Sequence, residues 1–187
     1  ALGVLSLDPE NANGIRSPGW SVLTEAKRVD VSRFKRFFVL VPSSRLSEVS
    51  AVVKEAQRLH KLSGLLIRAE VESADWLISQ FAKTDLRSLR NAIVHSDSRL
   101  PYRVLSAWRY GAQHQLIALA SADKLALYIR DCSLKRYVIP KTKVPILKKL
   151  EDSVFQDFSV APNGEFLHWP QPDLHLDLSS LRAVVDP

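Results

Sequence analysis

Methionine is absent from this chain of 187 residues, and cysteine occurs only at Cys132. A single cysteine excludes an intrachain disulfide and a zinc site built from several cysteines, and it fits a reducing compartment. No histidine is paired with Cys132 in a recognisable catalytic pattern, so we expect a buried thiol rather than a nucleophile. Because a chain without methionine does not start at its initiator, we expect a processed or trimmed form, compatible with a longer parent protein.

Glycine and long apolar runs are also scarce. The six glycines form no GxGxxG or GxxxxGK[ST] array, and no GxSxG sequence is present, which excludes the standard phosphate loops and the hydrolase nucleophile elbow. No apolar run approaches the ~18 residues of a membrane span, and no basic segment precedes an apolar stretch as in a signal peptide. We therefore expect a cytoplasmic protein that does not contact a membrane.

The composition, 46% hydrophobic and 25% charged, is that of an ordinary folded protein, but its net charge of +6 is unevenly distributed. Residues 1–25 carry −2, residues 26–149 carry +14 and residues 150–187 carry −6. We predict three parts: an N-terminal arm (1–25), a basic α/β body (26–150) and an acidic C-terminal hairpin segment (151–187).

This charge pattern has several interpretations. In one interpretation the basic body binds a polyanion, and in a second the body and the acidic tail dock on each other. Both can hold if the tail covers a basic face until nucleic acid displaces it. The alternative is a basic surface that is simply solvated.

The first half of the chain predicts alternating strands and helices. The opening stretch through Trp20 is rich in turn-forming residues and predicts an arm or loop. Apolar spacing then predicts a strand over 34–41, a helix over 45–62, a strand over 65–71 and a helix over 73–94. We expect Ser43 and Ser44 to cap the first helix and Gly64 to end it. This order is typical of a βαβα unit.

The second half predicts strands over 102–108, 124–130 and 135–139, and one helical turn over 146–150. Residues 115–122 fit a short helix and a buried strand equally well. The fold class we predict is α/β or α+β, with a βαβα start, a mixed sheet, later antiparallel strands and a C-terminal β-hairpin.

The acidic tail predicts a hairpin and carries a resemblance. Asn163-Gly164 predicts a two-residue turn in a hairpin that ends at Trp169, and Asp177 is placed to cap a final helical turn. The tail resembles a small bacterial domain of unknown function that is often joined to a phage-repressor-like helix-turn-helix. The matching positions are Gly164, Leu167, His168, Trp169, Pro170, Asp173, Asp177 and Leu181. The resemblance implies a regulatory or interaction role and supplies no catalytic residues; His175 in the acidic run departs from the pattern.

Two patterns suggest metal chemistry. Asp173, His175 and Asp177 alternate, so in an extended segment they point the same way, with His168 nearby, as ligands of Zn²⁺ or Mn²⁺. A solvated strand face with a helix cap also explains them, and we favour that interpretation, which predicts no metal and no cofactor.

Glu25-Ala26-Lys27 has the Glu-x-Lys form of restriction-type nucleases, in which an upstream acid, here Asp8, joins the glutamate on Mg²⁺. Too little chain precedes Asp8 to build the helix and strand that such a fold requires.

Basic clusters with aromatic neighbours are the stronger signal. Aromatic residues at Phe34, Tyr102, Trp108, Tyr110 and Tyr137 are interleaved with them, a composition that suits phosphate contact and base stacking, although such aromatics are often core residues beside snorkelling cations. The predicted nucleic-acid-binding residues are Lys27, Arg28, Arg33, Lys35, Arg36, Arg87, Arg90, Arg103, Arg109, Lys135 and Arg136.

We therefore predict a non-enzymatic regulatory or interaction module that binds nucleic acid. The alternatives are a metal-dependent nuclease that uses Glu25 and Lys27, and a protein-assembly subunit whose basic face meets an acidic protein partner or a second copy of the chain.

Overall fold

The computed structural model describes residues 2–9, 19–70 and 90–185. Its contacts divide the chain into two compact units, Ala1–Tyr102 and Arg103–Pro187, which we call the N-terminal unit and the C-terminal unit. This boundary falls inside the predicted basic body and coincides with neither predicted division. Within the described part of the chain, no helix is both long and apolar enough to cross a bilayer.

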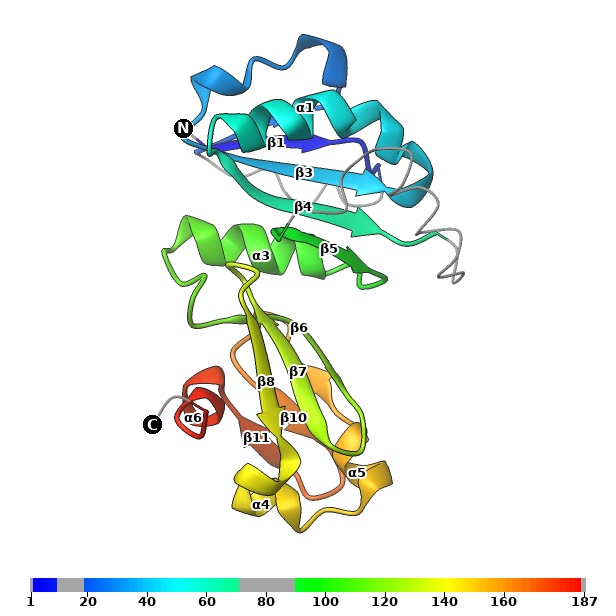
Figure 1. Cartoon of the computed structure of the whole chain (residues 1–187), viewed down its shortest axis with the longest axis vertical. Coiled ribbons are helices and arrows are strands. Elements are labelled where there is room, and N and C mark those ends of the chain that lie inside the picture. The colour runs from blue at the N-terminus through cyan, green and yellow to red at the C-terminus, as the bar shows by residue number, and fades with distance from the viewer. Residues whose placement is uncertain (1, 10–18, 71–89, 186–187) are drawn as a thin grey trace. The chain divides into compact units, whose positions relative to one another are not determined.

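The N-terminal unit contains a five-stranded parallel sheet in the order β2-β1-β3-β4-β5 (Figure 1). Its strands are β1 (Leu2–Ser6), β2 (Trp20–Leu23), β3 (Arg36–Pro42), β4 (Leu62–Arg68) and β5 (Ala92–His95). The prediction of an arm is wrong for β1 and β2, since β1 lies between β2 and β3 and pairs with both. The turn-forming residues that suggested an arm begin only at Asp8, after a short apolar run that is long enough for one buried strand.

The predicted strand–helix–strand unit is confirmed as β3, α1 (Leu46–Arg58) and β4, with β3 and β4 parallel. One face of α1 is buried, as its spacing predicts, through Leu46, Val49, Val52, Val53 and Ala56.

The predicted ends of this helix are wrong. A 3₁₀ turn (Ser43–Arg45) precedes α1, no side chain caps it, and the Ser43 hydroxyl instead accepts a hydrogen bond from the Glu70 N–H. The chain leaves the helix through His60, whose φ is 55°, so Gly64 lies inside β4.

Two further predictions are corrected. Most of the predicted helix 73–94 lies outside the described residues, but its end is strand β5, paired with β4. Residues 102–108 belong to helix α3 (Leu100–Arg109), not to a strand. The buried residues Leu100, Val104 and Ala107 follow helical spacing, which the short alternation in this segment concealed.

The C-terminal unit contains two antiparallel three-stranded sheets. The first is formed by β6 (Ile117–Ala122), β7 (Ala126–Asp131) and β8 (Arg136–Pro140), the second by β9 (Ser159–Val160), β10 (Leu167–Trp169) and β11 (Leu174–Leu176). The short helices are α4 (Pro145–Lys148), α5 (Asp152–Gln156) and α6 (Leu178–Arg182). The ambiguous segment 115–122 is thus largely strand, and the predicted fold class is confirmed, with parallel and antiparallel strands in separate sheets.

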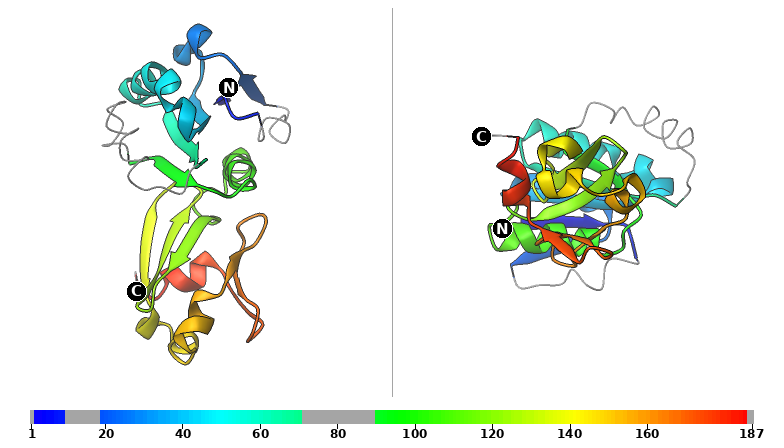
Figure 2. Two further views of the ribbon diagram at one scale, coloured as in Figure 1. Left: turned by 90° about the vertical axis from the view of Figure 1, so that its right-hand side faces the viewer. Right: turned by 90° about the horizontal axis from the view of Figure 1, so that it is seen from below.

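The acidic segment is an integral part of this unit. The ribbon of the later elements lies against β6–β8 (Figure 2). One core joins them through Ile117, Leu127, Ile129, Tyr137, Ile139, Phe155, Leu167, Trp169, Leu178 and Leu181. The Trp169 indole N–H donates to the Phe155 carbonyl at 2.8 Å. Since these side chains are buried, displacing the tail would unfold the unit, which excludes the tail as a detachable cover for β6–β8.

The predicted hairpin is present as β9–β10, but its connection is longer than two residues. Gly164 has φ 82°, Asn163 is not in the left-handed region, and the Ala161 N–H donates to the Phe166 carbonyl at 2.9 Å. A Cβ at Gly164 would overlap the carbonyl oxygen of Ile117, so the position requires glycine for space as well as for φ. The predicted cap is confirmed, because the Asp177 carboxylate accepts from the Ser180 N–H at 2.8 Å.

Candidate functional site

The sheet β6–β8 has one buried face and one exposed face. Leu127 and Ile129 are buried, whereas Tyr128 between them is 41% exposed. In the antiparallel register Tyr128 lies opposite Val138, which is 52% exposed. Partners in the register share a face. We call this surface the outer face; it comprises Leu119, Ser121, Tyr128, Arg130, Arg136 and Val138.

Two arginines lie directly opposite each other on the outer face. Arg130 of β7 pairs with Arg136 of β8, and the Arg130 guanidinium donates to the Leu134 carbonyl at 2.9 Å. Burial, and secondarily the charge of Arg136, lower the pKa of Arg130, although an arginine stays protonated. Like charges in this arrangement destabilise a sheet, so the pair concentrates positive charge at a cost to stability.

The tyrosine beside this pair is held in place by an acid. The Tyr128 hydroxyl donates to Asp123 at 2.6 Å, and the other carboxylate oxygen of Asp123 accepts from the N–H groups of Leu125 and Ala126. The hydrogen bond to Asp123 raises the pKa of Tyr128, so the ring is neutral at physiological pH. An exposed ring fixed at its far end offers a flat surface on which a nucleobase can stack.

Tyr137, one of the aromatic residues that the sequence interleaves with its cations, does not fill this role. Tyr137 is only 6% exposed, and its hydroxyl hydrogen-bonds Asp131 at 3.2 Å, so it belongs to the core. The missed residues Tyr128, Arg130 and Val138 have a signal in the sequence: they are out of phase with the apolar residues of their strands. Of the predicted cations of this sheet region, Lys135 and Arg136 are exposed.

Arg103 is corrected from a phosphate-binding residue to a structural one. It is 3% exposed, and its guanidinium donates to the carbonyls of Ala118 at 2.6 Å and Pro162 at 3.2 Å. Arg109 is exposed and lies over the Tyr110 ring at 5.3 Å. Arg90 is exposed, and Arg87 lies outside the described residues.

The N-terminal unit carries a second group of cations between β2 and the start of β3. All five predicted residues of this segment are exposed: Lys27, Arg28, Arg33, Lys35 and Arg36. The acid among them, Asp30, accepts hydrogen bonds from the N–H and hydroxyl of Ser32. Those bonds, and then the charges of Arg33 and Lys61, lower the pKa of Asp30. The segment is strongly positive but has no exposed aromatic ring comparable to Tyr128 among its described residues.

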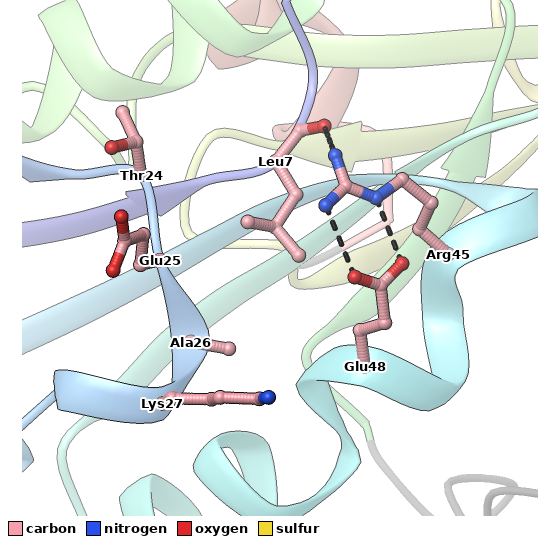
Figure 3. Close-up of a pocket in the computed structure, with 7 residues that line it drawn as sticks. All are labelled: Leu7, Thr24, Glu25, Ala26, Lys27, Arg45 and Glu48. Carbon is pink, nitrogen blue, oxygen red and sulfur yellow. Dashed lines mark hydrogen bonds and ion pairs between the residues drawn. The ribbon is translucent and has the colours of Figure 1, made fainter.

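A pocket of about 300 Å³ opens at the carboxyl ends of β1, β2 and β3 (Figure 3). The strand order of the sheet reverses at β1, and open parallel sheets bind ligands beside such reversals. In one wall, Arg45 forms a two-point ion pair with Glu48 and donates to the Leu7 carbonyl at 3.0 Å. The other lining residues are Thr24, Glu25, Ala26 and Lys27.

This pocket does not assemble the nuclease triad. Glu25 and Lys27 line it, but Asp8 does not, and the Asp8 carboxylate is 1% exposed and paired with the Arg68 Nε at 2.7 Å. Lys27 lies in a 3₁₀ turn (Ala26–Arg28) rather than on the strand that a restriction-type site requires. The geometry thus gives Asp8 a structural role.

Among the family-like residues, Gly164 and Trp169 are buried and serve the fold, whereas His168 faces Asp173 at 3.2 Å across the β10–β11 turn. Cys132 is buried, and burial raises its pKa to about 12, which confirms the predicted buried thiol. His95 is buried as well, and burial lowers its pKa.

Comparison with known proteins returns no match: no family model, no curated protein and no solved structure is significantly similar to this chain. The resemblance of the tail to a bacterial domain stays a prediction.

Proposed function

We propose that the C-terminal unit binds single-stranded nucleic acid on the outer face of β6–β8, as a non-enzymatic module in a regulatory process. The observation that carries the proposal is the directly opposed pair Arg130–Arg136 next to the exposed Tyr128. Phosphates would neutralise the two arginines, and a base would stack on the tyrosine ring.

An exposed sheet face suits a single strand better than a duplex. Splayed bases reach side chains that stand upright on a sheet, whereas the bases of a duplex are enclosed by their backbones. Val138 and Leu119 add apolar surface beside Tyr128 and Arg130, which favours contact with a base over contact with phosphate alone. The cations of the N-terminal unit provide a second positive surface without such a platform.

Fluorescence anisotropy with labelled single-stranded RNA and DNA at two salt concentrations tests this proposal, with duplex DNA for comparison. We expect Tyr128→Ala to weaken single-strand binding by about 5- to 150-fold, the loss of one stacked base. Arg136→Gln should reduce the dependence of log K on log salt by about 0.7 for each phosphate that the arginine neutralises.

Arg58→Gln is the matched control, since it removes the same charge from an exposed arginine of α1 that pairs with Glu55. It should leave affinity and salt dependence nearly unchanged. Absence of binding at low salt, or equal affinity of wild type and an Arg130→Gln/Arg136→Gln double variant, would overturn the proposal. If no nucleic acid binds at low salt, we would assign the basic surface to an acidic protein partner.

The nuclease alternative rests on one observation, that Glu25 and Lys27 line a common pocket. The same binding reactions with and without Mg²⁺, followed by a gel of the probe, decide it. A probe shortened only with Mg²⁺, and protected by Lys27→Ala, would establish the nuclease; an intact probe excludes it.

A further inference from the structure

A cluster of two histidines and an aspartate lies on the β10–β11 hairpin. His168 and His175 are directly opposite in the antiparallel register, and their rings stack with centroids 4.3 Å apart. Asp173 precedes β11 in the connecting turn, and its carboxylate lies 3.2 Å from the His168 Nε2. One potential ligand atom from each of the three side chains lies within 4.8 Å of the others.

The backbone of the hairpin fixes this arrangement. Asp173 has φ 48°, a left-handed conformation that aspartate adopts more readily than most non-glycine residues. The turn is closed by the Asp173 N–H, which donates to the Pro170 carbonyl. Phe166 packs edge-on against the His175 ring, with centroids 4.8 Å apart. The two imidazoles thus stand side by side, with the carboxylate on one of them.

We propose that His168, Asp173 and His175 bind a divalent transition-metal ion, with Zn²⁺ as the preferred occupant. Two imidazoles and one carboxylate are a ligand set that Zn²⁺ uses where further positions are filled by water. Calcium and magnesium prefer all-oxygen ligands and do not suit it.

The separations between the three ligand atoms are close to those of a metal site. Metal–ligand bonds of about 2.0–2.1 Å in a tetrahedron place ligand atoms about 3.3 Å apart. The His168–Asp173 separation of 3.2 Å already matches this value. No pair of these atoms is more than 4.8 Å apart, so each must close by at most about 1.5 Å, and metal binding requires the stacked rings to tilt until their nitrogen lone pairs converge on the ion.

The site is open to solvent and to exchange. The side chains of His168 and Asp173 are 32% and 83% exposed, and His175 is exposed as well. A metal ion here therefore keeps water ligands and ties β10 to β11. Since the ion binds only the folded hairpin, it should raise the unfolding temperature as its concentration rises.

The first test titrates the full-length chain, without an added histidine tag, with Zn²⁺ in competition with a chromophoric chelator. Substitution by Co²⁺ and its visible absorption band reports the coordination geometry. We expect one ion per chain, and weaker binding at about pH 5 than at about pH 7.5, because protonated imidazole does not coordinate. His168→Gln and His175→Gln should each weaken binding by more than about tenfold.

Asp173→Asn keeps a residue that tolerates a left-handed φ while it removes the charged ligand, so it should weaken Zn²⁺ binding in a chain that still folds. His114→Gln is the control, an exposed histidine of the same unit outside the cluster. Circular dichroism of each variant separates loss of binding from loss of folding. No saturable binding, or equal affinity of wild type and the His168→Gln/His175→Gln double variant, would overturn the proposal. In that outcome the two rings are only a stacked cross-strand pair.

Discussion

In the N-terminal unit the central strand β3 is buried at six of its seven residues, whereas β7 and β8 of the C-terminal unit alternate between buried and exposed residues. Phe37, Val39 and Val41 of β3 pack in the core with α1, and Phe38 and Leu40 on the opposite face are equally buried. A parallel sheet covered on both faces exposes its functional groups only at an end, here the pocket beside Glu25 and Lys27. An antiparallel sheet with one free face exposes a whole row of side chains.

The two sheets therefore expose their functional side chains at different places, one at an end of its strands and the other along a face. Arginine shows the contrast within a single unit: Arg103 donates to backbone carbonyls inside the C-terminal unit, whereas Arg130 and Arg136 stand together on its outer face. The number of basic residues does not distinguish these uses. The face on which an arginine lies decides whether it serves the core or the surface.

The largest expected effect compares the loss of stability from a substitution in the core of the C-terminal unit with that from one on the outer face of β6–β8. Among the fully buried residues that the structure describes, Trp169 has the largest side chain. Trp169→Ala removes it and leaves the Phe155 carbonyl without the indole donor, so we expect a loss of about 3–5 kcal/mol in unfolding free energy. Val138→Ala on the outer face should cost no more than about 0.5 kcal/mol. Hydrogen exchange of amides in β7 and β8 under increasing urea measures both. Equal losses would contradict the assignment of one free face.

The next effect compares two glycines with positive φ. Gly164→Ala combines left-handed strain with overlap on the Ile117 carbonyl, whereas Gly111→Ala meets no atom within 4 Å at a φ of 69°. We expect about 1–2 kcal/mol for Gly111→Ala and clearly more for Gly164→Ala. Urea denaturation of both variants gives the order. The reverse order would show that the β9–β10 turn is less closely packed than the structure indicates.

A smaller effect compares the two helix starts. Asp177→Ala removes the cap of α6 and should cost about 1 kcal/mol near neutral pH, whereas Ser44→Ala before α1 removes no cap, only an exposed hydrogen bond to Glu70, and should cost less. Hydrogen bonds to Ser180 lower the pKa of Asp177, so the carboxylate's contribution is complete above its unfolded pKa of 3.8. It is lost as the pH falls through the lower folded value. Thermal unfolding of both variants between about pH 2 and pH 7 checks the sign.

The smallest expected effect is on the reaction of Cys132 with a thiol reagent, which should be very slow in the native chain. Burial raises the pKa of this thiol to about 12, so a thiol reagent at about pH 8 should modify the native chain far more slowly than the urea-unfolded chain. Mass spectrometry after timed quenching measures both rates. Fast labelling of the native chain would show that the core of the C-terminal unit opens readily.

Much of the N-terminal unit was predictable. The apolar run before Pro42 and the helical spacing from Leu46 to Ala56 predict β3 and α1, because each pattern is local and agrees with its tertiary environment. The prediction for residues 102–108 was wrong because a short segment fits two periods, and burial of Leu100, Val104 and Ala107 decides for the helix.

The candidate sites were only partly predictable. Arg136, His168 and His175 stood out in the sequence, but the pairing of Arg136 with Arg130 and of His168 with His175 is set by strand register. Tyr137 was named among the aromatic residues beside the cations and Tyr128 was not, because composition alone does not give the phase of a strand.

The sequence by itself determined the fold class, the charge segregation, the turn at Gly164 and the cap at Asp177, since these follow from composition and from patterns among residues close in the chain. Only the tertiary structure decided that the acidic segment completes the core of the C-terminal unit and that Arg103 is buried. It also set the pairing of His168 with His175 and of Arg130 with Arg136. The physical reason is that burial and register depend on which distant segments pack together, and one residue of register moves every side chain to the opposite face.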